Sequence, residues 1–367
     1  MHSKSIVASS TLVPRDEGGK LVRAVTCAGQ GRVAFRDDAI QPKIELPFDA
    51  LVKVTTSAIC GTDIHLLHGA VGELPTGTVI GHEVVGTIVE VAPAVRRFKV
   101  GDRVVATNQT ACGVCWYCRK GFRSQCADRS AFGHGPLLGE DLSGGQAEYV
   151  RVPVADTNLH AVPAGVTDEQ ALFVGDIFVT AYAAARNADV HPGDTVAVIG
   201  CGPVGLLAIM CADVFGAARI FGIDRAPLRL EYAERVGAEP LNSAAEDAAA
   251  VVKTKTEGRG ADAVIDCAGG SATLNLGLSL VRPRGTVSVV GVPTDDFALP
   301  GIATMVSEIT IRFGIGDPSV AGRLMELMLA GRLDPTKIVS HRLPLEQAEE
   351  GYGLFETQQA VKVLLVP

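Results

Sequence analysis

The sequence predicts an α/β protein with two parts, a mostly antiparallel β unit and a doubly wound parallel sheet. Three observations support this prediction. Short β-branched runs follow one another through the first half of the 367 residues, strand and helix patterns alternate from His191 onward, and a glycine-rich turn opens the first helix of that alternating half. The composition, 47% hydrophobic residues with 41 glycines, is typical of a globular protein of this class.

The charge and hydropathy patterns argue against two classes of partner. Nucleic-acid binding depends on clustered Lys and Arg, which no segment of this chain of net charge −8 provides. No apolar run reaches the about 18 residues of a membrane-spanning helix, so we expect no membrane contact. Residues 1–23 are expected to form an N-terminal extension without the apolar stretch of a signal peptide, and we expect a cytoplasmic enzyme.

The first half reads as successive strands. Apolar and polar residues alternate over 20–30 and 31–37, and a third strand at 50–56 leads toward Cys60. The run 84–91 is β-branched, and Gly101 marks a tight turn before the next strand. We therefore expect a compact antiparallel unit.

A candidate catalytic metal site lies within that unit. Cys60 and the pair His82 and Glu83 offer a thiolate, an imidazole and a carboxylate, which are the ligand types of a catalytic zinc with one open position. Asp176 follows in an apolar stretch of a helix predicted over 166–186, where an unpaired carboxylate is costly. We predict Asp176 as the third ligand; the alternative is that it caps this helix.

Four cysteines predict a second metal site. Three follow one another at intervals of three and the fourth comes eight residues later, in a lobe at 108–130: Cys112, Cys115, Cys118 and Cys126. Four thiolate ligands that leave no open coordination position are typical of a structural zinc site. The alternative is a loop of reduced cysteines that binds no metal. We expect this zinc to hold an irregular lobe that has little core of its own.

A nucleotide-binding turn opens the second half. A short buried strand at 194–199 runs directly into Gly200, Gly202, Pro203 and Gly205, and a helix follows to about 215. In this context the first glycine permits the turn, the second admits a pyrophosphate, and the third lets strand and helix pack closely. The proline suits the first turn of the helix, where no hydrogen-bond donor is lost.

The next strand, at 219–223, ends in Asp224, and Arg225 follows it. A carboxylate here accepts hydrogen bonds from ribose hydroxyls and repels a 2′-phosphate, which favours NAD over NADP; a guanidinium at the next position is the argument for NADP. Further strands are expected at 263–267, 286–290 and 309–313, and helices at 226–236, 244–255, 271–281 and 320–330. A last strand is expected at 360–366.

These motifs and their order resemble the zinc-dependent medium-chain dehydrogenases of the alcohol dehydrogenase superfamily. The residues 144–150 and 176–182 are most similar to the branch with glutathione-independent formaldehyde dehydrogenases and bacterial secondary-alcohol and polyol dehydrogenases. The resemblance implies a GroES-like catalytic domain at 24–178, a Rossmann domain at 179–315, and a return to the catalytic domain at 316–367.

The resemblance also implies roles for matching positions. Cys60, His82 and Asp176 would bind the catalytic zinc, with Glu83 as an alternating or outer ligand and Asp63 orienting His82. Thr62 would take the substrate proton and His65 would pass it to solvent. The cofactor would contact Thr180, Gly200, Gly202, Pro203, Val204, Gly205, Asp224, Arg225, Arg229 and Val292.

The expected activity is hydride transfer between a small alcohol or carbonyl substrate and NAD, with two zinc ions per chain. One alternative is a formaldehyde dehydrogenase or dismutase that holds NAD tightly, and another is a non-catalytic NAD-binding protein on the same fold. The apolar region 302–313 is expected to join two coenzyme sheets into a homodimer or homotetramer. The identity of the alcohol stays open, because pocket loops are not specified by these patterns.

Overall fold

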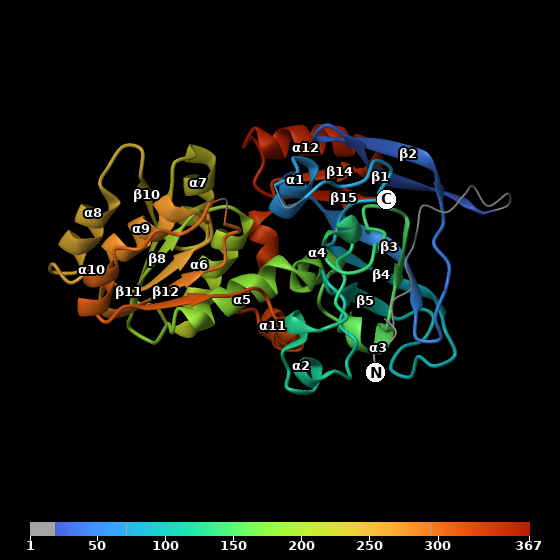
Figure 1. Cartoon of the computed structure of the whole chain (residues 1–367), viewed down its shortest axis with the longest axis horizontal. Helices are drawn as coiled ribbons and strands as arrows, with labels where there is room; N and C mark the ends of the chain where they lie inside the picture. The colour runs from blue at the N-terminus through green and yellow to red at the C-terminus, as the bar shows by residue number, and fades with distance from the viewer. Residues whose placement is uncertain (1–18, 71, 294) are drawn as a thin grey trace. The chain divides into compact units, whose positions relative to one another are not determined.

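The computed structural model describes residues 19–70, 72–293 and 295–367 (Figure 1). Unit 1 holds the described residues up to Asp176 together with Asp317–Ala330 and Val339–Pro367, and unit 2 holds Ile177–Gly316 and Gly331–Ile338. Most of the expected N-terminal extension, residues 1–18, lies outside the described residues, and the first strand begins at Leu21. A search of the described helices finds none with both the length and the apolar character needed to cross a membrane.

Unit 1 is built on a mostly antiparallel sheet, which confirms the fold class predicted for the first half. Only β14 and β15 pair in parallel within it, and β1 and β2 form a separate antiparallel pair. The seven-stranded sheet runs, in spatial order, β14 (His341–Pro344), β15 (Val363–Val366), β3 (Ala50–Ala58), β4 (Val84–Val91), β5 (Arg103–Ala106) and β7 (Leu159–Ala161), with β6 (Tyr149–Val152) on β3; the separate pair is β1 (Leu21–Gly29) and β2 (Arg32–Ile40).

One glycine shows how closely β3 and β4 pack. A Cβ atom at Gly86 would lie 2.1 Å from the carbonyl oxygen of Lys53, so any other residue would push the two strands apart. Val52 on β3, Ile88 on β4 and Val104 on β5 belong to one buried apolar cluster. Short helices surround the sheet: α1 (Gly61–Leu67), α2 (Trp116–Arg119), α3 (Ala155–Asn158), α4 (Asp168–Leu172), α11 (Ala321–Leu329) and α12 (Ala348–Glu356). Figure 1 shows α12 beside β2 and β14, so this C-terminal helix packs against an N-terminal strand as well as against a neighbouring C-terminal one.

The single helix predicted over 166–186 is wrong. The chain forms α4, a 3₁₀ turn at Phe173–Gly175, and then α5 (Ile177–Asn187), and Asp176 between them has φ −144° and ψ −83°. The turn lies against the end of β5, because a Cβ at Gly175 would come within 2.4 Å of the Ala106 carbonyl oxygen. Asn108 also donates its backbone N–H to the Gly175 carbonyl at 2.9 Å, which removes that acceptor from a continuous helix.

Unit 2 is a six-stranded sheet whose neighbouring strands are all parallel (Figure 1). The order is β10 (Glu239–Asn242), β9 (Arg219–Asp224), β8 (Thr195–Ile199), β11 (Ala261–Asp266), β12 (Val281–Val289) and β13 (Thr310–Phe313). The helices are α5, α6 (Pro203–Phe215), α7 (Pro227–Arg235), α8 (Ala248–Lys255), α9 (Ser271–Leu280) and α10 (Gly301–Val306).

The helices of unit 2 form two sets. α5 and α7 pack beside α6, whereas α8 packs beside α9, as expected for a doubly wound sheet. The strand order reverses between β8 and β11, and in such sheets ligands bind at the carboxyl ends of the strands at this reversal. The loop that follows β8 is the glycine-rich turn, so the sheet places that turn at the expected binding crevice.

Candidate active site and metal centres

The structure brings four predicted metal ligands together in unit 1. One ligand atom from each of Cys60, His82, Glu83 and Asp176 lies within 4.8 Å of the others, and all four residues are buried. Cys60 comes two residues after β3, His82 and Glu83 immediately precede β4, and Asp176 occupies the helix break. The Asp176 Oδ2 atom lies 3.1 Å from His82 Nε2 and 3.7 Å from Cys60 Sγ. The two neighbouring β strands and the break therefore create this cluster.

The chemistry of this cluster fits a divalent metal. Burial raises the pKa of the Cys60 thiol, while the charge of the neighbouring His82 opposes that rise. Burial disfavours the protonated His82 imidazole, but the negative charges of Asp63 and Cys60, with hydrogen bonds to Asp176 and Asp63, together outweigh burial and raise the pKa well above its usual value. Glu83 Oε2 is buried without a hydrogen-bond partner among the described residues. A bound cation would stabilise the Cys60 thiolate and would give the unpaired Glu83 oxygen a partner.

Two residues fix the orientation of the candidate ligands. Asp63 Oδ1 lies 3.1 Å from His82 Nδ1, and Asp63 Oδ2 accepts a hydrogen bond from the Cys60 backbone N–H at 3.0 Å. Asn108 donates from Nδ2 to Asp176 Oδ1 at 2.6 Å, which leaves Oδ2 facing Cys60 and His82. The family resemblance implied the role of Asp63. Asn108 was not predicted, since a lone asparagine after a strand carries no metal-site signal.

A buried lysine contacts all three ligand-bearing segments. Lys362 is fully buried, and its Nζ donates to Glu83 Oε1 at 2.7 Å and to the Ile59 carbonyl, next to Cys60, at 3.0 Å. The same Nζ lies 6.0 Å from the ring centre of Phe173, in the turn that leads to Asp176. Burial lowers the pKa of Lys362, but the charges of Glu83, Cys60 and Asp176 and the hydrogen bond to Glu83 together outweigh burial, so the net pKa is raised. A lysine within the apolar run 360–366 was a signal for a buried charge, and the sequence analysis did not use it.

The predicted proton-relay residues lie on α1, which begins directly after Cys60. Thr62 Oγ1 is 3.8 Å from Cys60 Sγ, so its hydroxyl faces the candidate centre. His65 lies one turn further along α1, and no hydrogen bond joins it to Thr62 in the described part of the chain. His134, to which the sequence analysis gave no role, places its ring centre 5.2 Å from that of His82, and burial lowers its pKa.

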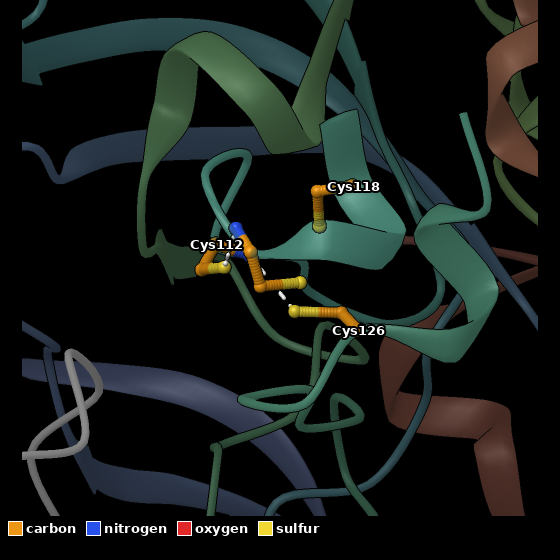
Figure 2. Close-up of side chains that lie close together, drawn as sticks. Cys112, Cys118 and Cys126 are labelled. Carbon is orange, nitrogen blue, oxygen red and sulfur yellow. Dashed lines mark hydrogen bonds between the residues drawn. The ribbon is translucent and has the colours of Figure 1, made fainter. Parts of the chain in front are cut away.

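The four lobe cysteines also converge. One sulfur from each of Cys112, Cys115, Cys118 and Cys126 lies within 4.8 Å of the others, and Figure 2 shows three of these side chains pointing toward a common centre. The Cys112 backbone N–H donates to Cys126 Sγ at 3.2 Å. Backbone N–H groups of Ala127 and Cys118 lower the pKa of Cys115 to about 6, whereas burial raises the pKa of Cys112 to about 11. Beyond these cysteines the local apolar cluster contains only Ala111 among the buried described residues, so the donor set fits a structural metal.

The glycine-rich turn of unit 2 has the geometry of a phosphate cradle. Gly200 has φ +85°, which favours glycine, and a Cβ at Gly205 would lie 1.8 Å from the Gly200 carbonyl oxygen. A Cβ at Gly202 would meet nothing closer than Arg229 at 4.0 Å. The first and third glycines are thus required by the backbone, while the second leaves open space in front of the N-terminus of α6, where an anion binds favourably.

The other predicted cofactor residues all lie in unit 2. Asp224 ends β9 and accepts hydrogen bonds from the backbone N–H groups of Cys201 at 2.8 Å and Arg225 at 2.7 Å. Arg229 Nη1 is 3.8 Å from Asp224 Oδ2, so the carboxylate and the guanidinium stand together beside the turn. The remaining residues occupy α5 (Thr180), the start of α6 (Pro203 and Val204) and the segment after β12 (Val292).

Comparisons with known proteins find matches to both parts of the chain. Residues 47–164 match the family described as alcohol dehydrogenase GroES-like domain, and residues 203–328 match zinc-binding dehydrogenase. Zinc-type alcohol dehydrogenase B of Aspergillus flavus is 39% identical over 352 residues, covering 94% of this chain and 81% of that protein. The structure of alcohol dehydrogenase TADH from Thermus sp. ATN1 is 43% identical with a TM-score of 0.90, covering 94% of this chain and 99% of that one. A zinc-binding dehydrogenase of Sinorhizobium meliloti, solved with NADP, is 29% identical with a TM-score of 0.82, covering 95% of this chain and all of that one.

Proposed function

The chain belongs to the zinc-dependent medium-chain dehydrogenase family and is an oxidoreductase acting on CH–OH groups, and we propose that it transfers hydride between a small alcohol and NAD. The observation that carries this proposal is the buried convergence of Cys60, His82 and Asp176 in unit 1. A non-catalytic NAD-binding protein has no need of such a costly cluster of ionisable groups.

In the proposed mechanism the protein binds, orients and moves a proton. Cys60, His82 and Asp176 would hold a zinc ion, which would supply the Lewis acidity that lowers the pKa of an alcohol. Thr62 accepts the proton of the substrate hydroxyl and His65 passes it to solvent. Asp63 holds the His82 imidazole, and the glycine-rich turn of unit 2 would hold the cofactor, which would supply the hydride chemistry. Glu83 stays beside the centre as an outer or alternating ligand, paired with Lys362.

A substrate panel tests this function. NADH formation at 340 nm should appear with at least one class among primary alcohols, secondary alcohols, polyols and formaldehyde, and it should require both NAD and zinc. NAD that stays bound through purification, together with conversion of one aldehyde into acid and alcohol, would instead favour a dismutase. Absence of any redox chemistry from protein that holds zinc and binds NAD would overturn the proposed activity.

The carboxylate of Asp224 supports NAD as the cofactor. It lies beside Arg229 at the end of β9, where its charge would repel the 2′-phosphate of NADP. Asp224→Asn keeps the shape and removes the charge, so we expect the NAD-to-NADP ratio of kcat/KM to fall by about tenfold or more, which corresponds to roughly 1.4 kcal/mol. Steady-state kinetics with both cofactors measures this ratio.

Arg225→Gln is the matched control for this prediction. If Arg225 is a solvated surface charge, its loss leaves the ratio unchanged. If the wild type prefers NADP and this variant loses the preference, the assignment of NAD is wrong and Arg225 is the phosphate ligand.

A second copy of this chain is the proposed partner of unit 2. β13 is an edge strand of the sheet, and Ile302, Val306 and Phe313 near it are 79%, 73% and 57% exposed. Edge pairing of two such strands would cover this apolar surface in a symmetric dimer. Light scattering of the purified protein should give the mass of a dimer or tetramer, and a monomer at micromolar concentration would rule the pairing out.

The cytoplasm is the proposed compartment. All nine cysteines are free thiols in the structure, and a four-thiolate metal site requires reduced cysteines. Fractionation of the source cells tests this, and recovery of the enzyme outside the cytoplasm would contradict it.

A further inference from the structure

Gln146 connects, through hydrogen bonds, the segments that carry the candidate ligands Cys60 and His82. Its side chain is fully buried, and Nε2 donates to the Ala58 carbonyl at 3.0 Å and to Asp63 Oδ2 at 3.3 Å. Its Oε1 accepts a hydrogen bond from the Tyr352 hydroxyl at 3.0 Å. The amide therefore uses its oxygen and both of its N–H groups, which is the full satisfaction that a buried polar network requires.

The backbone around Gln146 is equally constrained. Its N–H donates to the Ile80 carbonyl at 2.9 Å, two residues before His82. Gly81 has φ +92°, and a Cβ there would lie 2.4 Å from Gln146 Cγ. The segment that presents His82 is thus pressed directly against the Gln146 side chain, and no larger residue than glycine fits between them.

Tyr352 determines which way the amide points. Burial raises the pKa of its phenol well above the usual value, and the charge of Asp63 adds to that rise, so the hydroxyl stays protonated. A protonated hydroxyl directed at Gln146 selects the amide oxygen as its acceptor. The NH₂ end must then face Asp63, whereas a flipped amide would direct an oxygen at that carboxylate.

We propose that Gln146 and Tyr352 are positioning residues for the metal centre, acting in the order Tyr352, Gln146, Asp63, His82. The hydroxyl orients the amide, the amide holds the Asp63 carboxylate, and Asp63 in turn faces Nδ1 of His82 at 3.1 Å. Neither residue contacts the candidate ligand atoms in the described structure. The inference rests on the proposed metal centre, and it extends the support of that centre to Tyr352 on α12.

The rate of zinc release to a chromogenic chelator tests this order of action. Loss of an outer hydrogen-bond partner of a metal-bound histidine typically lowers metal affinity by about 10- to 100-fold, so we expect Gln146→Leu to speed release from the catalytic centre by about tenfold or more. Tyr352→Phe keeps the ring and should give a smaller acceleration. In the double variant, Tyr352→Phe should add nothing to Gln146→Leu, because its effect passes through the amide. Release from the four-cysteine site serves as the internal reference.

The absorption spectrum of the cobalt-substituted centre gives a second readout, since a rotated His82 changes the ligand field whereas a mere loss of stability does not. Thr256→Val, which removes a buried hydroxyl from unit 2, is the control for such a loss. Additive effects in the double variant would overturn the order of action. Unchanged zinc release in both single variants would overturn the proposal itself. Retention of both zinc ions by the Cys60→Ser variant would refute the metal centre instead, and the inference with it.

Discussion

Cys60→Ser is expected to abolish alcohol oxidation and to remove one of two zinc ions from the chain. Serine keeps the size of the side chain but offers a weak metal ligand, and the remaining His82 and Asp176 are too few for a catalytic site. Metal-ion catalysis contributes several kcal/mol to a reaction of this class, so kcat/KM should fall by roughly 10³-fold or more. Zinc content by atomic absorption and NADH formation, measured on the same preparation, check both parts.

Two variants control for the loss of a buried thiol. Cys211 is buried in α6, outside both cysteine groups, so Cys211→Ser should keep both zinc ions and full activity. Cys118→Ser should lose the other zinc ion and loosen the lobe, with NADH formation declining in step with unfolding. Activity retained in Cys60→Ser would mean that this thiol is no ligand.

Lys362→Met is expected to destabilise unit 1 by about 3–5 kcal/mol. The ammonium group is fully buried and is paired at 2.7 Å with the equally buried Glu83 carboxylate, so its removal leaves an uncompensated negative charge beside Cys60, His82 and Asp176. Methionine retains most of the packing of the lysine side chain, so the loss of stability reports on the lost charge and not on a change in volume. The chain has a single tryptophan, Trp116 in unit 1, whose fluorescence during urea unfolding reports on that unit.

The double variant Lys362→Met with Glu83→Gln distinguishes the cost of an unpaired buried charge from the cost of lost packing. Removing both charges should recover much of the lost stability, because the cost lies in the unpaired charge and not in the absence of the pair. A double variant as unstable as Lys362→Met, or a single variant as stable as the wild type, would contradict this account of the Lys362 contact.

The features that could be predicted from the sequence are those that depend on neighbours along the chain. The strand before Gly200 and the helix after it predict a nucleotide-binding turn, because the backbone requires glycine at 200 and 205, and Gly202 leaves space for a pyrophosphate. The metal ligands predicted from the intervals among the lobe cysteines and from the apolar surroundings of Asp176 likewise depend only on neighbouring residues in the sequence. The α/β class with its antiparallel and parallel parts could be predicted for the same reason, since side-chain periodicity is a local property.

The residues that support the site from distant parts of the sequence could be identified only from the tertiary structure. Lys362 and Glu83 are 279 residues apart in the sequence, and they come into contact because β15 pairs with β3. Tyr352 and Gln146 are 206 residues apart, and they come into contact because α12 packs within the same unit. The break that frees Asp176 from a helix depends on the approach of Gly175 to β5. Strand pairing and close packing bring together groups whose separation along the chain carries no pattern, so burial and hydrogen-bond satisfaction can be judged only after the chain has folded.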